Sequence, residues 1–215
     1  MSPRIVIIDY DCGNLFSLQG ALSELKVPSM ITRDVDEIKK ADKIILPGVG
    51  AFGDGIGHIH EFGLLDVLLK AATSGKPMLG ICLGMQLLMR ESFEFGHHKG
   101  FGFIDGKVTR LSEQNSEGGV VKVPHIGWNA VNFPQSEETR STYLRKIDAG
   151  TYVYFLHSFF VTPDNAKYAV GITEYGENKF CSIIQKENIL GFQFHPEISG
   201  PMGLKLLENF VKHDI

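Results

Sequence analysis

The sequence predicts an α/β fold of three layers, a doubly wound and mostly parallel sheet with an antiparallel β extension in the second half of the chain. In the first half, short apolar runs alternate with helical patterns, as in strands joined by crossover helices. In the second half, shorter alternating segments are separated by polar loops. The chain has 215 residues, 43% of them hydrophobic, and neither a repeat nor a convincing linker, so we expect residues 1–215 to form a single domain.

The first half of the chain supplies the parallel strands. Short β-branched apolar runs are typical of strands buried on both faces. These runs occupy residues 5–8, 43–46 and 77–81, with a weaker strand at 30–31. Right-handed crossovers bring the carboxyl ends of parallel strands to one edge of the sheet. Asp9, Gly48 and Cys82 each follow a strand and are therefore expected at that edge.

Helical patterns follow the strands of the first half, and one more closes the chain. Apolar residues recur at helical spacing over residues 15–25, 56–68 and 85–89. Gly63 is expected to break or bend the second of these stretches, since glycine weakens a helix interior. The closing helix is amphipathic and carries Leu204, Leu207, Phe210 and Val211.

The second half reads as shorter strands connected by polar loops. Alternating segments rich in β-branched and aromatic residues predict strands of the antiparallel extension. These segments span residues 101–108, 120–123, 152–156, 168–172 and 180–184. Residues 189–194 form another predicted strand, which ends at His195. The loops expected between them include residues 112–119 and 134–141, where small and polar side chains gather.

Composition and charge exclude several classes of function. The net charge is −4 and the lysines and arginines are scattered, which argues against a nucleic-acid stripe or a polybasic membrane surface. No apolar stretch is long enough to span a bilayer or to form a signal peptide. The three cysteines have neither disulfide-scaffold nor zinc spacing, so we expect reduced thiols in a cytoplasmic protein without a metal site.

A cysteine between two glycines is the feature around which the chain is organised. Gly80 and Gly84 flank Cys82 at the point where an apolar strand passes into a helix. This pattern is typical of a nucleophile elbow, in which the side chain stands at a helix N-terminus that favours a thiolate. A buried cysteine that merely packs as a small apolar residue is the other interpretation, and the local pattern leaves both open.

A nucleophilic cysteine needs a base, and His195 is the best placed of the eight histidines. Pro196 favours an extended conformation at His195, so the side chain of Glu197 is expected to point the same way as the imidazole. Such a carboxylate fixes the imidazole tautomer and leaves the other ring nitrogen for a thiol. The alternative is a strand end with an incidental acid. The neighbouring pairs His58/His60 and His97/His98 lack metal-ligand spacing.

A glycine-rich loop follows the strand at residues 43–46. Gly48, Gly50 and Gly53 spell G-x-G-x-x-G, which makes a dinucleotide-binding module the rival interpretation. The loop is not in the first strand-to-helix turn, however, and Lys70 stands where an acid is expected. The same backbone amides can instead bind the oxyanion of a tetrahedral intermediate. The flanking glycines also allow the peptide around Val49 more than one orientation, so a peptide flip is a further hypothesis.

Several motifs resemble the triad, or class I, glutamine amidotransferase family over most of the chain. The most specific are Gly80-Ile81-Cys82-Leu83-Gly84 and Gln193-Phe194-His195-Pro196-Glu197. Within that family, Pro124-His125-Ile126-Gly127-Trp128-Asn129 is similar to subunits that serve histidine biosynthesis. The resemblance implies that residues 1–215 are one amidotransferase domain that hydrolyses glutamine to glutamate and ammonia and uses no cofactor.

The resemblance also implies roles for individual residues. It makes Cys82 the nucleophile, His195 the base and then the acid, and Glu197 the residue that orients His195. The remaining assignments are an oxyanion site at Val49, Gly50 and Leu83, and glutamine contacts at Gln86, Glu94, Ser158 and Phe159.

Free ammonia protonates in water at neutral pH, so a partner that receives it directly is expected. The resemblance implies a heterodimer with a (β/α)8-barrel cyclase that makes imidazole glycerol phosphate. Asn14, His125 and Trp128 are the candidates for the partner-facing surface. The alternative is a paralogous subunit that feeds a ligase-like enzyme of surface-sugar biosynthesis, and a dinucleotide-binding or regulatory module is more remote.

Overall fold

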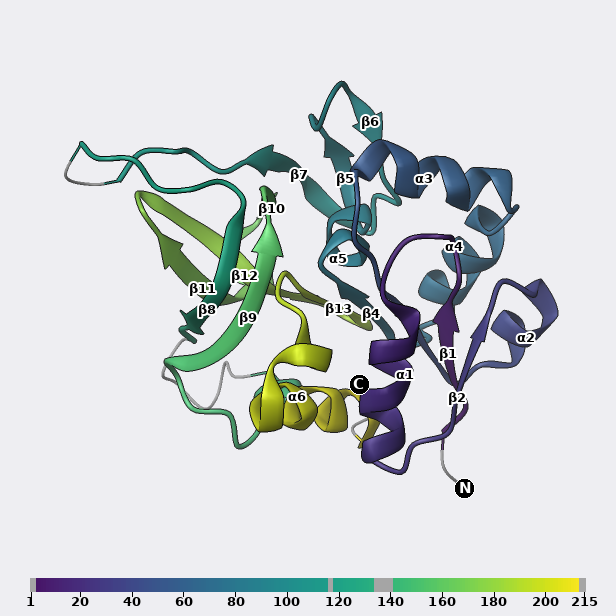
Figure 1. The fold of residues 1–215 in the computed structure, drawn as a ribbon. Helices are drawn as coiled ribbons and strands as arrows, with labels where there is room; N and C mark the ends of the chain where they lie inside the picture. Colours follow the sequence, from purple (N-terminus) through teal and green to yellow (C-terminus); the bar gives the residue numbers. More distant parts are fainter. Residues whose placement is uncertain (1–2, 116–117, 134–140, 213–215) are drawn as a thin grey trace.

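The computed structural model describes residues 3–115, 118–133 and 141–212 (Figure 1). Among these residues, one large mixed sheet runs through the molecule in the order β2-β1-β3-β4-β13-β12-β10-β7-β5-β6, with β11 paired to β12. A separate two-stranded ribbon of β8 and β9 stands beside it. No helix within the described ranges is long and apolar enough to cross a membrane.

Five parallel strands form one half of the sheet, four of them as the sequence predicts, with the strand at residues 189–192 as the fifth. Their apolar side chains are buried on both faces at the centre, which is why the runs read as continuously hydrophobic. The strands are β1 (Ile5–Ile8), β2 (Ser29–Thr32), β3 (Lys43–Leu46), β4 (Met78–Ile81) and β13 (Ile189–Phe192). Antiparallel pairing begins where β13 meets β12.

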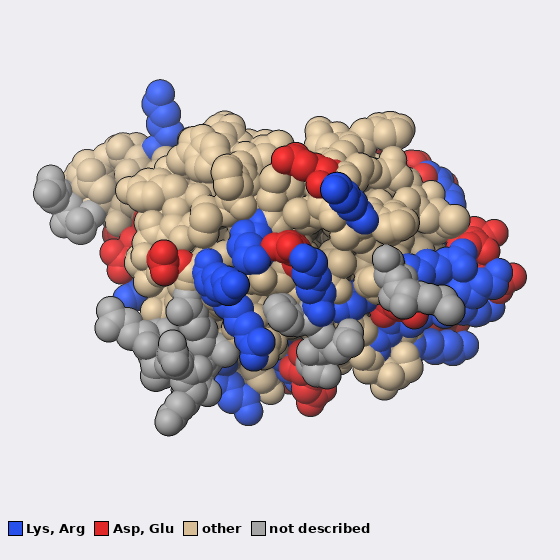
Figure 2. All heavy atoms as spheres, turned by 90° about the horizontal axis from the view of Figure 1, so that it is seen from below, with Lys and Arg blue, Asp and Glu red and all other residues tan. Residues whose placement is uncertain are grey.

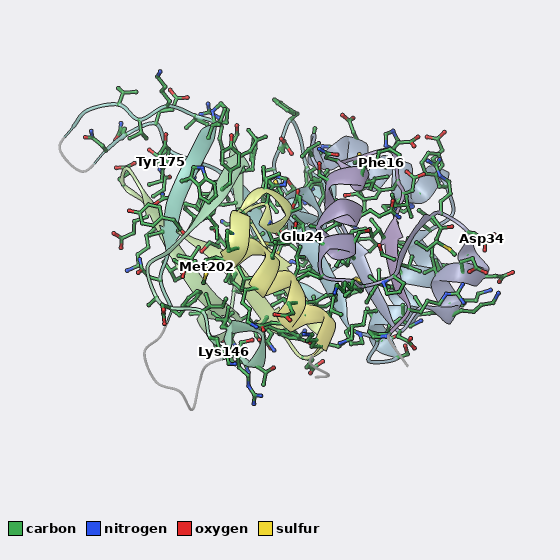
Figure 3. All side chains as sticks on the ribbon, turned by 60° about the horizontal axis from the view of Figure 1, so that its bottom comes forward. Phe16, Glu24, Asp34, Lys146, Tyr175 and Met202 are labelled. Atoms are coloured by element: carbon green, nitrogen blue, oxygen red, sulfur yellow. The ribbon has the colours of Figure 1, made fainter. Side chains whose placement is uncertain are left out.

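Helices cover both faces of the parallel strands, which confirms the predicted three layers. The helices are α1 (Leu15–Glu24), α2 (Val35–Lys40), α3 (Phe52–Glu61), α4 (Leu65–Thr73), α5 (Leu83–Leu87) and α6 (Gly200–Lys212). One apolar core packs helices α1 and α6 against the sheet. The other packs helices α2, α3, α4 and α5 against it. Figure 3 shows α1 and α6 side by side, with Phe16 projecting from the first turn of α1.

The second half contributes the antiparallel extension. Its strands are β5 (Met89–Ser92), β6 (His98–Lys99), β7 (Ile104–Arg110), β8 (His125–Val131), β9 (Thr151–His157), β10 (Phe159–Pro163), β11 (Ala169–Tyr175) and β12 (Asn178–Lys186). Within the described ranges, short 3-10 helices occupy Thr142–Leu144, Ala166–Tyr168 and Pro196–Ile198. The pairing is not wholly antiparallel, because β5 lies parallel to β7.

Some predicted elements differ from the structure. Residues 120–123 are not a strand: Val120 forms an isolated bridge with Gln114 and is 80% exposed, so no sheet face holds this segment. The strand predicted at 101–108 begins only at Ile104. The helix after Cys82 ends at Leu87, although the helical pattern was expected to continue to residue 89. Met89 is instead the first residue of strand β5. Of the predicted loops at 112–119 and 134–141, residues 116–117 and 134–140 lie outside the described part.

Two local signals were interpreted correctly. Gly63, at φ +66°, separates α3 from α4, so the predicted helical stretch over 56–68 is two helices. The first helix begins where expected, since the side chain of Asn14 caps it by accepting a hydrogen bond from the amide of Ser17 at 3.2 Å.

Charged side chains of both signs are interspersed on the face shown in Figure 2, where lysines and arginines lie among aspartates and glutamates. The ion pairs between them are mostly on the surface and joined by short sequence separations, as in Lys39 with Asp36 at 2.8 Å. Such pairs stabilise a fold only weakly.

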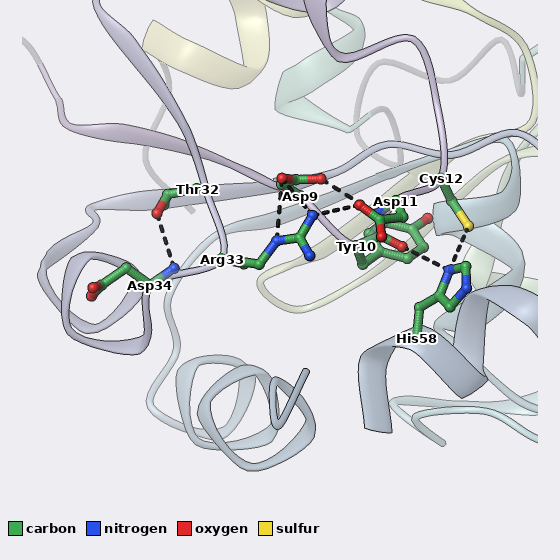
Figure 4. A network of polar contacts seen from close by, with 8 residues as sticks. All are labelled: Asp9, Tyr10, Asp11, Cys12, Thr32, Arg33, Asp34 and His58. Atoms are coloured by element: carbon green, nitrogen blue, oxygen red, sulfur yellow. Dashed lines mark hydrogen bonds and ion pairs between the residues drawn. The ribbon is translucent and has the colours of Figure 1, made fainter. Parts of the chain in front are cut away.

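A polar network fixes the loop that follows β1 (Figure 4). Arg33 forms ion pairs with Asp9 at 2.8 Å and Asp11 at 2.5 Å, and its guanidinium stacks over Phe62. The Sγ atom of Cys12 lies 3.6 Å from Nδ1 of His58. This network holds the loop beside the glycine-rich loop after β3.

The helix after Cys82 packs unusually close to strand β3. A Cβ atom added to Gly84 would overlap the carbonyl oxygen of Leu46, and one added to Gly80 would lie 2.6 Å from the amide nitrogen of Met85. Both glycines therefore permit the sharp return of the chain from β4 into α5. Neither contact is made by the end of a flexible side chain, so the backbone itself would have to move to admit a methyl group.

We predict that Gly84→Ala lowers the free energy of unfolding by about 3 kcal/mol, because the new methyl group overlaps the backbone of β3. Gly57→Ala is the matched control. Gly57 lies exposed within α3 with open space around it, so alanine there should stabilise the protein by about 0.5–1 kcal/mol. Urea unfolding measures both, and equal effects of the two substitutions would contradict the close packing described here.

Candidate active site

Cys82 stands in a strained backbone conformation between β4 and α5. Its φ of 51° and ψ of −107° are rare for a residue other than glycine. Its amide donates to the carbonyl of Phe192 at 2.7 Å, and its carbonyl accepts from the amide of Gln86 at 3.1 Å. The surrounding sheet and helix thus hold the elbow that the sequence predicts, and they present the thiol at the N-terminus of α5.

A cavity of about 190 Å³ opens beside the thiol. The cavity brings together Cys82 with six further residues predicted for the site, and adds two that were not predicted. The predicted lining residues are Val49, Gly50, Leu83, Gln86, Ser158 and Phe159, and the others are Leu156 and His157. The volume suits a substrate of amino-acid size. Segments from both halves of the chain therefore form its wall.

His195 and Glu197 form a buried pair behind the thiol. Nδ1 of His195 lies 2.8 Å from Oε1 of Glu197, and both side chains are more than nine-tenths buried. His195 is extended, at φ −101° and ψ 95°, as its position before Pro196 predicts. Because the carboxylate accepts the Nδ1 proton, Nε2 remains free of a hydrogen-bond partner among the described residues. That nitrogen is available to the sulfur.

The charge state of His195 depends on its two neighbours. Burial alone lowers the pKa of this imidazole. The Cys82 thiolate and the Glu197 carboxylate together have the larger effect and raise the pKa to about 10. Negative charge on these two neighbours therefore favours the protonated imidazole. The arrangement has the order sulfur, imidazole, carboxylate that activates a nucleophile in triad enzymes.

The other two cysteines lack such an environment. Burial, together with the neighbouring Asp54 and Asp11, raises the pKa of the Cys12 thiol to about 11. Cys181 is buried and its pKa is raised as well. None of the three is in a disulfide, and the described residues contain no group of histidine, cysteine and acidic side chains that could hold a metal ion.

The predicted oxyanion site is closed. The amide of Leu83 donates to the carbonyl of Gly48 at 3.3 Å, so a carbonyl oxygen occupies the place where an oxyanion would bind. The Gly48 backbone lies against the Tyr10 hydroxyl, which donates to the carbonyl of Pro47. Gly50 has a φ of +122° that alanine would adopt only with strain.

The predicted substrate contacts divide into two groups. Gln86, Ser158 and Phe159 line the cavity, and Nε2 of Gln86 donates to the Phe159 carbonyl at 2.9 Å. Glu94 does not line it. Its carboxylate accepts from the amide of Phe52 at 2.7 Å, at the start of α3, and burial raises its pKa. Glu94 thus stabilises the helix that follows the glycine-rich loop.

One of the three residues expected on a partner-facing surface is buried. His125 is only 3% exposed, so its prediction as a surface residue is wrong for this chain. Its ring stacks on Tyr175 and Phe155, and its Nδ1 lies 3.1 Å from Nε2 of His157. Trp128 is 54% exposed and Asn14 is exposed at the start of α1, as predicted.

Two polar residues at the site received no assigned role from the sequence. His157 lines the cavity and donates from Nδ1 to the Phe159 carbonyl at 2.9 Å. Gln193 is completely buried with its Nε2 3.7 Å from the sulfur of Cys82. A signal for Gln193 was present, because it is a polar residue in an apolar strand end two positions before His195.

Comparison with known proteins identifies the family. Residues 6–213 match the family model described as glutamine amidotransferase class-I. The chain belongs to the class-I glutamine amidotransferase family. It is therefore an enzyme with glutaminase activity, and the dinucleotide-binding interpretation of the glycine-rich loop is not favoured.

Relatives of this amidotransferase extend over nearly its full length. The chain is 41% identical over 207 residues to the imidazole glycerol phosphate synthase subunit HisH of Syntrophotalea carbinolica, covering 96% of this chain and 98% of that protein. It is 44% identical over 209 residues to the protein of the same name from Sulfurimonas denitrificans, with 97% and 98% covered. The paralogous alternative in surface-sugar biosynthesis is not favoured by these names.

Solved structures confirm the fold of this amidotransferase. A crystal structure of a glutamine amidotransferase superposes with a TM-score of 0.72 at 16% identity, covering 96% of this chain and 97% of that one. The structure of PurLQS from Thermotoga maritima gives 0.69 at 21% identity, with 98% of each chain covered.

The buried histidine pair predicts how stability depends on pH. Burial and the neighbouring His125 lower the pKa of His157 from 6.5 to about 3. A lowered folded-state pKa gives stability that is present above pH 6.5 and is lost as the pH falls towards 3. In that window the unfolded chain binds one more proton than the folded chain at this residue.

We therefore expect His157→Gln to flatten the acid side of the stability curve by about 1.4 kcal/mol per pH unit near pH 5. Urea unfolding at several pH values measures this slope. The control is His60→Gln, an exposed residue of α3, which should leave the slope unchanged. A slope in the His157 variant equal to that of the wild type would show that His157 is not held neutral by burial.

Proposed function

We propose that this chain is the glutaminase subunit that supplies ammonia for imidazole glycerol phosphate synthesis in histidine biosynthesis. The observation that carries the proposal is the position of Cys82 beside the His195–Glu197 pair, at the wall of a small cavity. The names of the full-length relatives support the choice of pathway. The match over residues 6–213 supports a single amidotransferase domain over 1–215. We also propose that this domain acts in the cytoplasm.

The reaction begins with attack of Cys82 Sγ on the side-chain amide carbon of glutamine. His195 Nε2 receives the thiol proton and then gives a proton to the departing nitrogen, which leaves as ammonia. Glu197 holds the imidazole in the tautomer that this transfer requires. Water then attacks the resulting glutamyl thioester with His195 as base, which releases glutamate and restores the thiol.

The tetrahedral intermediates need an oxyanion site that is closed in this structure. A rotation of the Gly48–Val49 peptide would withdraw the Gly48 carbonyl from the Leu83 amide and turn the Val49 amide towards the cavity. We propose that Val49, Gly50 and Leu83 form the open site after this rotation. This rotation changes ψ of Gly48 and φ of Val49, and the absence of a side chain at Gly48 gives the backbone the conformational freedom that it needs.

We propose that the glutamine substrate is held at both polar ends. Gln86 and the Phe159 backbone line one wall of the cavity, and Ser158 lies between the β9 and β10 strands at its mouth. Glu94 does not line the cavity, and its carboxylate already accepts a hydrogen bond from the amide of Phe52. We propose that the same carboxylate also contacts the substrate ammonium. A carboxylate can accept several hydrogen bonds, so both contacts are compatible.

We also propose that the chain forms a heterodimer with a (β/α)8-barrel cyclase that takes up the ammonia, and the side chains around the cavity mouth support this proposal. Exposed apolar side chains gather around it: Val49 and Leu156 line the cavity and are each 40% exposed. Trp128 packs edge-on against Tyr154, and Ile126 is 57% exposed on the same ribbon. Asn14 caps α1 and is the third proposed contact. Clusters of exposed aromatic and aliphatic residues are typical of interface hot spots.

We expect Cys82→Ala to abolish glutamine-dependent turnover and to leave ammonia-dependent turnover of the assembled enzyme intact, because only the acyl step needs the sulfur. Steady-state assays of the complex with each nitrogen source measure this, and copurification measures partner binding. Cys12→Ala serves as the control and should keep both activities. Full glutamine-dependent turnover in the Cys82 variant would contradict the role of this residue.

The closed oxyanion site predicts low activity in the isolated chain. Because loss of one oxyanion donor costs about 3 kcal/mol in the barrier, opening the site should raise glutamine hydrolysis by roughly a hundredfold or more. Adding the cyclase and its nucleotide ligand should produce this rise in a steady-state glutaminase assay. High activity of the chain alone, unchanged by partner and ligand, would show that the peptide does not need to rotate.

A further inference from the structure

Gln193 is a buried polar residue that the reaction above does not use. Gln193 directly follows strand β13, and its backbone N–H donates to the Ser182 carbonyl at 3.0 Å. Its side chain is inaccessible to solvent and lies between two residues of the site. Nε2 of Gln193 is 3.7 Å from Cys82 Sγ, and Oε1 accepts from Nε2 of Gln86 at 3.4 Å.

The orientation of this amide follows from its neighbours. Gln86 directs its NH2 group to the Phe159 carbonyl, which can only accept a hydrogen bond. The second hydrogen of that NH2 group faces Gln193, so the oxygen of Gln193 must lie on that side. The NH2 group of Gln193 therefore faces the sulfur. Exchanging its two amide ends would place two donors against each other and an acceptor against the thiolate.

Two neutral groups next to the sulfur favour opposite charge states. The carbonyl of Leu156, 3.6 Å from Sγ, accepts a hydrogen bond from the thiol and would be repelled by a thiolate. The Gln193 amide donates to sulfur, and a donor stabilises the charged form more than the neutral one. Because the site is buried, each of these contacts acts with little screening by water.

We propose that Gln193 is a positioning residue that holds the sulfur of Cys82 for attack and favours its thiolate by N–H donation, with its orientation set by Gln86. The inference rests on the proposed function, in which Cys82 is the nucleophile. It also connects the substrate wall to the nucleophile, since Gln86 lines the cavity and contacts Gln193 from behind.

Alkylation of Cys82 by iodoacetamide as a function of pH tests the proposal on the full chain, with the adduct mapped by mass spectrometry. Gln193→Met keeps the length of the side chain and removes the donor. The pH of half-maximal alkylation should rise by about one unit. The titrations of His195 and Tyr10 are coupled to the charge of Cys82, and the substitution alters neither residue.

Two further variants make the result decisive. Gln185→Met makes the same change on strand β12, away from the cavity, and should leave the profile unchanged. Gln193→Asn keeps a buried amide but withdraws it by one methylene, so it should shift the profile in the same direction if Gln193→Met does not fold. Circular dichroism and thermal unfolding identify the folded variants. An unshifted profile in the folded Gln193 variant overturns the proposal.

Kinetics separate positioning from simple support of the substrate wall. Positioning of the sulfur predicts that kcat for glutamine falls about tenfold with little change in KM, whereas support of Gln86 alone predicts a raised KM and an unshifted alkylation profile, which would overturn the proposal. Labelling of wild-type Cys82 by a glutamine-like electrophile tests the proposed function separately. Absence of that label contradicts the glutaminase assignment of Cys82, whatever the Gln193 variants show.

Discussion

The close approach of helix α5 to strand β3 determines where the nucleophile stands. Gly84 contacts the Leu46 carbonyl without a side chain between them, and Gly80 lies against the first turn of the same helix. The chain must therefore turn sharply at residue 82, and Cys82 adopts a positive φ because both flanking elements are fixed in the core. The cavity, the His195–Glu197 pair and the glycine-rich loop are all placed relative to this turn.

Much of the parallel half of the fold could be predicted, because its strands are buried on both faces and carry uninterrupted apolar runs. Helix α2 carries no apolar pattern that would predict it, because Ile38 is the one buried residue among its six. The segment at 120–123 resembles a strand in composition, but Pro124 follows it and its bridge from Val120 to Gln114 is isolated. Periodicity reports the preferences of a segment and not whether a partner strand is present.

The candidate site was predictable where a single segment carries its chemistry. Cys82 and the His195–Glu197 pair follow from local sequence, because glycine spacing and a proline determine their conformations. His125 was misplaced because it lies on β8, where alternate residues face opposite sides: His125 is buried while Ile126 and Trp128 are exposed. The contact of Gln193 with sulfur joins residues 111 positions apart and has no local signature beyond its polarity.

The glycine-rich loop is held at both ends, and this constrains how it can move. The Tyr10 hydroxyl holds the Pro47 carbonyl before the loop, and the Glu94 carboxylate holds the Phe52 amide after it. Residues 48–51 between these two anchors can therefore change by a crankshaft rotation of one peptide, without displacing either strand β3 or helix α3. In the proposed heterodimer, a partner that contacts the exposed Val49 would change the state of the site through a small interface contact.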